Sequence, residues 1–132
     1  MQTDVIESTL TEWETPQTWP AGAPLFHEGE EPRGVYVLRS GQAGIQVTTR
    51  EGKVRPLRVA SAGQILGLSA VVMRRPYECS AVARTRCEAG FIDRDTLLRV
   101  IEDRPSVRLS LLSILSSEVK AAFDEIRSFS RR

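Results

Sequence analysis

The sequence predicts a mainly β domain with flanking helices, and two observations support this fold class. Glycines punctuate the middle of the chain at nearly even intervals and in turn-like contexts, at Gly29, Gly41, Gly52 and Gly63. The short β-rich runs between these turns are typical of an antiparallel roll, barrel or sandwich. The second observation is a long helical pattern that closes the chain, over about residues 105–129.

Three runs between the glycines are predicted strands: GVYVLR, AGIQVTT and VRPLRVA. In the second run Ala43, Ile45 and Val47 alternate with smaller or polar residues, and this period of two indicates a half-buried strand. After Gly67 we expect one apolar helical turn, followed by two more strands in ECSAVA and CEAGFID.

Helices are expected near both ends of the chain. Residues 3–12 are predicted to form a short helix that leads into a segment rich in Trp and Pro. Asp93 or Asp95 can cap a helix through TLLRVIED. Pro105 suits the first turn of the last helix, because proline has no N–H to lose there.

The last helix carries a heptad pattern of apolar residues that recur alternately three and four positions apart. These residues are Leu112, Leu115, Val119, Ala122, Ile126 and Phe129. The pattern predicts a partner helix and therefore a homodimer, whereas the plainer alternative is an amphipathic helix that lies on its own domain. A second set, Leu111 and Ile114, faces elsewhere and can pack on the roll.

Composition narrows the class of protein. The 132 residues suffice for one domain, and 41% hydrophobic with 27% charged residues is ordinary for a soluble globular protein. A net charge of +1 predicts no binding of nucleic acid through this chain alone. No apolar run has the length of a membrane span and the N-terminus lacks secretion features, so a cytoplasmic location is expected. Cys79 and Cys87 lack CxxC spacing and are expected to be small buried residues.

Catalysis is not expected. His27 is the only histidine, and a metal-binding β-roll of the cupin type needs several histidines and a carboxylate, so no metal cofactor is predicted. His27 is instead predicted to be a loop residue. No arrangement of nucleophile, base and orienting acid is recognisable, because one histidine leaves little choice of base.

The segment QILGLSAVV is the most suggestive of a binding site. A glycine at the start of a helical turn lets backbone N–H groups converge on an anion, and Ser69 could add a hydroxyl. The alternative is an ordinary turn between a strand and a helix. The nearby doublet of Arg74 and Arg75 has two similar interpretations, a solvated turn or an anion contact.

Residues 25–41, LFHEGEEPRGVYVLRSG, resemble a signature of the cyclic-nucleotide-binding domain of the catabolite-activator (Crp–Fnr) family. The matching positions are Gly29, Pro32, Gly34, Val35, Tyr36, Val37, Leu38 and Gly41. Residues 66–83 have the outline of the family's phosphate-binding cassette. The resemblance implies a double-stranded β-helix (jelly-roll) over residues 1–104, including the short N-terminal helix, and a C-terminal dimerisation helix over residues 105–132.

The residues of this cassette depart from the family pattern. They are Gly67, Leu68, Ser69, Ala70, Glu78, Cys79 and Ser80. The family usually places a glutamate for the ribose 2′-hydroxyl at the position of Leu68, and an arginine for the cyclic phosphate at the position of Glu78. Glu78 would repel a phosphate, and a buried, unpaired carboxylate would be costly. We therefore expect no standard binding of cAMP, no cofactor, and either another small anionic ligand or none.

The resemblance implies a regulatory sensor domain, part of or related to a Crp–Fnr-type transcriptional regulator. Regulators of this type continue into a helix-turn-helix domain, so the chain is expected either to belong to such a regulator or to act through partners. The alternative is a ligand-free dimeric interaction scaffold with a vestigial pocket. A pocket filled by Leu68, Tyr77 or other side chains would favour the scaffold, and an open, polar pocket would favour the sensor.

Overall fold

The computed structural model describes the backbone of residues 10–130 and the side chains of residues 10–117. In chain order the elements are η1 (Thr11–Trp13), β1 (Thr15–Trp19), β2 (Pro24–Phe26), β3 (Gly34–Ser40), β4 (Ala43–Thr48), β5 (Val54–Ala60), β6 (Ile65–Leu66), α2 (Leu68–Met73), β7 (Ser80–Ala83), β8 (Cys87–Asp93), α3 (Arg94–Asp103) and α4 (Pro105–Ser130). None of the described helices is long and apolar enough to cross a bilayer.

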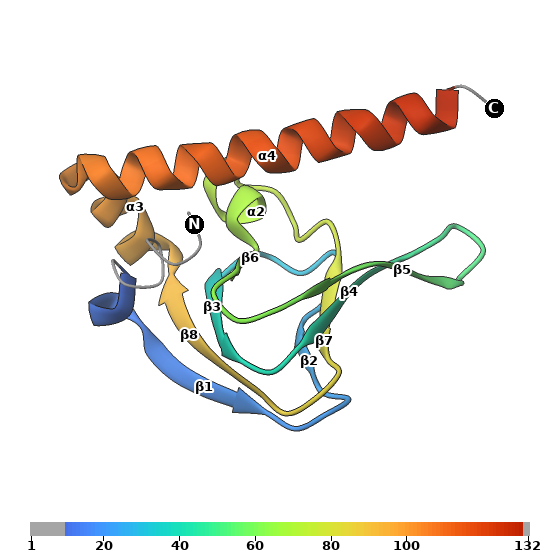
Figure 1. The fold of residues 1–132 in the computed structure, drawn as a ribbon, viewed down its shortest axis with the longest axis horizontal. Coiled ribbons are helices and arrows are strands. Elements are labelled where there is room, and N and C mark those ends of the chain that lie inside the picture. The colour runs from blue at the N-terminus through green and yellow to red at the C-terminus, as the bar shows by residue number, and fades with distance from the viewer. Residues whose placement is uncertain (1–9, 131–132) are drawn as a thin grey trace.

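The strands form two four-stranded sheets, with the orders β1-β8-β3-β6 and β2-β7-β4-β5. All of the pairings are antiparallel, and they are nested: β1 pairs with β8, β2 with β7, β3 with β6 and β4 with β5. This nesting makes the fold a jelly-roll, in which strands far apart in the sequence become neighbours (Figure 1). The predicted mainly β fold with flanking helices is therefore confirmed.

The alternation of side chains along the strands produces two separate apolar clusters. The first, which we call the roll core, contains Leu38 of β3 together with inward-facing residues of both sheets. The second, which we call the helix core, contains Val35 and Val37 from the other face of β3, packed with residues of α2, α3 and α4. Strand β4 shows the predicted period of two, since Ala43 and Ile45 are buried and the residues between them less so.

Helix α4 lies over α2 and α3 and extends beyond the roll (Figure 1). Leu111 is buried in the helix core and Ile114 packs against it, so the second apolar set lies on its own domain as predicted. Of the heptad residues, Leu115 also packs against the helix core, whereas Leu112 is 52% exposed. The remaining heptad residues have side chains outside those described; they are Val119, Ala122, Ile126 and Phe129.

The segment rich in Trp and Pro contains β1 and leads into β2, and the sequence predicted neither strand. Among the described residues, strand β1 is an edge strand that pairs with β8 alone. An edge tolerates Pro16 because its missing N–H is not needed in the ladder. Of the predicted helix over residues 3–12, only the end falls within the described residues, where Thr11–Trp13 forms a 3₁₀ turn.

Candidate ligand site

The segment between β6 and β7 folds as a turn, the short helix α2 and a second turn. Gly67 precedes α2 with a φ of 84°, in the left-handed region that favours glycine. A Cβ atom at Gly67 would lie 2.8 Å from the Tyr77 ring, so packing also requires glycine here. Helix α2 ends at Arg74 with a φ of 56°, and within the described residues Arg74 is the only non-glycine residue with a positive φ.

Helix α2 divides its side chains between the two apolar clusters. Leu68 is fully buried in the helix core beside Val71, and Ala70 is buried in the roll core. Ser69 is half-buried between them. A carboxylate in place of Leu68 would be surrounded by apolar side chains without a charged partner, which is unfavourable. Leu68 therefore occupies a core position.

Tyr77, from the turn after α2, reaches into the roll core. Its side chain is 5% exposed and its ring stacks on Phe26, with the ring centroids 4.2 Å apart. Its hydroxyl donates a hydrogen bond of 2.6 Å to the carbonyl oxygen of Gly34. Burial raises the pKa of Tyr77 to about 12, because the apolar surroundings disfavour the phenolate.

The aromatic stack continues from Tyr77 along the inside of the roll. Phe26 stacks on Tyr36 with a centroid distance of 5.6 Å, and Trp19 meets Tyr36 edge-on at 5.7 Å. These rings come from β1, β2, β3 and the cassette, and together they fill space between the two sheets. Tyr77 was considered as a filler from the sequence, but the other rings were not. The inward alternation of Tyr36 within GVYVLR was the available signal.

The second half of the cassette contributes little to the roll core. Glu78 is exposed, so the cost of a buried, unpaired carboxylate that the sequence suggested does not arise. Cys79 is half-buried against the roll core. The hydroxyl oxygen of Ser80 accepts a hydrogen bond of 2.8 Å from the backbone N–H of Glu28. Ser80 thus ties the loop after β2 to strand β7.

His27 is exposed in the loop after β2, as predicted, and its backbone N–H donates to the Glu30 carboxylate. Within the described part of the chain, no three His, Cys, Asp or Glu residues are grouped so that they could hold a metal ion.

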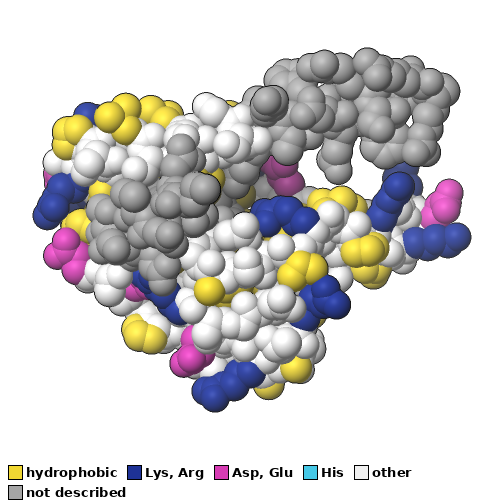
Figure 2. Space-filling view, viewed as in Figure 1, with side chains coloured by type: hydrophobic (Ala, Val, Ile, Leu, Met, Phe, Trp, Pro, Cys, Tyr) yellow, Lys and Arg dark blue, Asp and Glu magenta, His cyan; other side chains and the backbone are white. Residues whose placement is uncertain are grey.

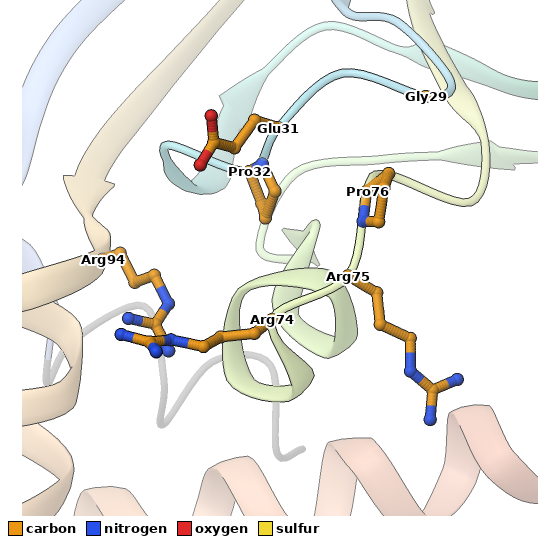
Figure 3. A pocket seen from close by; sticks show the side chains of 7 residues that line it. All are labelled: Gly29, Glu31, Pro32, Arg74, Arg75, Pro76 and Arg94. Carbon is orange, nitrogen blue, oxygen red and sulfur yellow. The ribbon is translucent and has the colours of Figure 1, made fainter.

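A pocket of about 490 Å³ lies outside the roll core, between the loop after β2, the end of α2 and the start of α3 (Figure 3). It is lined by Gly29, Glu31, Pro32, Arg74, Arg75, Pro76 and Arg94. The Nε–H of Arg94 donates a hydrogen bond of 2.9 Å to the carbonyl oxygen of Val71 at the end of α2. The arginine doublet was recognisable in the sequence, but Arg94 was missed because two strands separate it from the doublet.

Comparison with known proteins places this fold and cassette in a family. The family model described as the cyclic nucleotide-binding domain matches residues 16–104. The chain is 28% identical over 113 residues to a CRP-like cAMP-activated global transcriptional regulator of Mycobacterium tuberculosis, covering 86% of this chain and 50% of that protein. The chain spans about half the length of the curated relatives it matches.

Solved structures agree with this relationship. The catabolite activator protein of Thermus thermophilus superposes with a TM-score of 0.84 at 24% identity, covering 98% of this chain and 59% of that one. The sensor domain of the transcriptional regulator DNR of Pseudomonas aeruginosa superposes with a TM-score of 0.73 at 26% identity, covering 92% and 81%. The chain therefore belongs to the cyclic nucleotide-binding domain family and is related to the Crp–Fnr transcriptional regulators.

Proposed function

We propose that the chain is a dimeric regulatory domain of the Crp–Fnr type whose roll does not bind cAMP in the standard way. In this proposal residues 1–104 form the sensor roll and residues 105–132 the dimerisation helix. The relatives that the chain matches are named as transcriptional regulators, which supports a regulatory role.

The observation that carries the proposal is the position of Tyr77. Its ring lies on Phe26 inside the roll, and its hydroxyl is engaged by the Gly34 carbonyl. A ligand entering the roll core beside the cassette would have to displace this ring and break its buried hydrogen bond. Leu68, at the position where the family pattern has a ribose-binding glutamate, is committed to the helix core and offers no polar group.

Isothermal titration calorimetry with cAMP and cGMP tests this proposal. We expect no saturable heat with either nucleotide up to millimolar concentration, whereas the cAMP-activated relative of Mycobacterium tuberculosis serves as the positive control. Micromolar binding of either nucleotide would contradict the proposal.

The filled roll core also favours the alternative function, a ligand-free dimeric scaffold with a vestigial pocket. Both functions require a dimer interface on α4, where Leu109 and Leu112 are 67% and 52% exposed. Figure 2 shows apolar side chains on the surface over the first turns of this helix. A twin α4 is the occupant that the heptad spacing favours. The two functions differ in whether a small molecule binds the domain and shifts its conformation.

A further inference from the structure

We propose that the pocket outside the roll core is a binding site for a small phosphate-bearing molecule, held between Arg74 and Arg94. This site goes beyond the proposed function, because it lies outside the roll core that Phe26 and Tyr77 fill. It assigns a binding role to Arg74, the first residue of the arginine doublet.

The charges around the pocket are unbalanced. Three arginines and one glutamate line it, which leaves two net positive charges. Within the described residues, Arg74, Arg75, Arg94 and Glu31 take part in none of the ion pairs, which involve other residues. An anion in this pocket would therefore meet guanidinium groups that are not held in an ion pair with Glu31.

The two guanidinium groups that matter converge from different elements. In Figure 3 the side chains of Arg74 and Arg94 extend toward one another, whereas that of Arg75 points away toward α4. The Nε–H of Arg94 is held by the Val71 carbonyl, which fixes the direction of its guanidinium group. Like charges that face one another repel, and an anion that bridges them turns this repulsion into attraction.

Phosphate is the anion that this arrangement suits. The planar guanidinium fork matches the geometry of phosphate oxygens and can bind them in pairs. The volume of about 490 Å³ lies within the range of small-molecule pockets and exceeds what a bare phosphate needs. Pro32, Pro76 and the glycine at position 29 supply a wall without competing charge. A phosphate carried on a small organic group therefore fits better than the free ion.

The backbone of Arg74 supports a role for its side chain. A left-handed conformation costs a residue other than glycine about 1 kcal/mol, and this position ends a helix, where glycine is the usual solution. Arg74 is exposed, so packing of its side chain does not offset this backbone cost. From this position the side chain extends toward Arg94 (Figure 3).

Binding at this pocket would connect the cassette to the long helix. The anion would join the end of α2 to the start of α3, and both helices pack with α4 in the helix core. A ligand that binds one arrangement of these helices better than another shifts the domain toward that arrangement.

The test is calorimetry at constant ionic strength with four probes: inorganic phosphate, pyrophosphate, AMP and adenosine. Constant ionic strength removes general screening effects. The variants are Arg74→Gly and Arg94→Gln. The matched control is Arg58→Gln, an arginine of β5 that does not line this pocket. Arg74→Gly suits the left-handed backbone, so it removes the charge and should leave the fold intact even if Arg94→Gln does not.

We expect saturable binding of at least one phosphate-bearing probe and none of adenosine. Arg74→Gly and Arg94→Gln should each weaken this binding about tenfold or more, and Arg58→Gln less than twofold. Tighter binding of AMP than of inorganic phosphate would identify an organic phosphate as the ligand class. No saturable binding of any phosphate probe, or an equal loss in Arg58→Gln, would overturn the proposal. The same variants assign any heat that cAMP or cGMP gives: a loss in Arg74→Gly and Arg94→Gln places that binding in this pocket, and heat that persists in both places it in the roll.

Discussion

Tyr77 shows how a single residue can close the roll. It combines a stacked ring with a buried hydroxyl, so it fills apolar space and also pairs the Gly34 carbonyl. Gly67 leaves room for its ring, since a Cβ there would lie 2.8 Å from the ring, and Gly34 supplies the carbonyl oxygen that accepts from its hydroxyl. The tyrosine and these glycines therefore form one packing unit.

Tyr77→Phe should lower the free energy of unfolding by about 1–2 kcal/mol, because the Gly34 carbonyl loses its hydrogen-bond partner while the ring remains. Urea denaturation measures this loss. Tyr36→Phe is the matched control, since Tyr36 is half-buried in the same stack. Its hydroxyl makes no hydrogen bond within the described residues, so we expect a change below about 0.5 kcal/mol. Equal losses in the two variants would show that the Gly34 bond contributes nothing.

At the scale of elements, the side chain of Asp93 caps the N-terminus of α3, and the helix begins at Arg94. The sequence left Asp93 and Asp95 open as caps, and the structure chooses Asp93, whose carboxylate accepts from the Thr96 backbone N–H at 3.2 Å and from its hydroxyl at 2.6 Å. These hydrogen bonds lower the pKa of Asp93. The cap also sets the position of Arg94 at the pocket, because Arg94 is the first residue of the helix.

Asp93→Ala should lower the free energy of unfolding by about 1 kcal/mol, since two donors of Thr96 lose their acceptor. Asp95→Ala removes the same charge from the first turn without removing the cap, and should cost less, about 0.3–0.5 kcal/mol from the helix dipole. Thermal and urea unfolding of both variants at pH 7 measure the difference. Because the Asp93 pKa is lowered in the folded state, the cap's contribution is present above the unfolded pKa and is lost in acid. A larger loss in Asp95→Ala would contradict the assignment of the cap.

At the scale of the whole molecule, the helix core joins the roll to the helices. It contains residues of β3, β8, α2, α3 and α4, so a displacement of the cassette helix is felt by α3 and α4 through direct packing. The exposed Leu109 and Leu112 lie on a different face of α4 from the buried Leu111. One helix can thus pack on its own domain and still offer an apolar strip to a twin.

Leu112→Glu should weaken self-association about tenfold or more, because a charge would be placed in the apolar seam of the proposed dimer. Sedimentation equilibrium measures the dissociation constant. Ser117→Glu is the control, since this residue is exposed on the same helix outside the heptad positions. The Leu112 side chain is exposed in the single chain, so the fold should tolerate the change. A monomeric parent protein, or an unchanged dissociation constant in Leu112→Glu, would refute a dimer held through this position.

The sequence alone predicted features that depend on a few neighbouring residues. Glycine turns, the period of two in β4 and the proline at the start of α4 depend on the conformational preferences of a few neighbouring residues. Strand β1 was not predicted because its proline-rich segment gives no local strand pattern. Its pairing with β8, far away in the chain, is what stabilises it. The outline of the cassette was recognisable, but not the direction in which each of its side chains points.

The sequence by itself therefore determined the fold class, the cassette outline and its unusual residues, because each depends on residue type and spacing. Only the tertiary structure decided that Leu68 lies in the helix core, that Tyr77 fills the roll and that Glu78 faces solvent. It also brought Arg94 to the same pocket as Arg74. The physical reason is that burial and charge proximity depend on nested pairings between distant strands, which bring together residues that no local pattern connects.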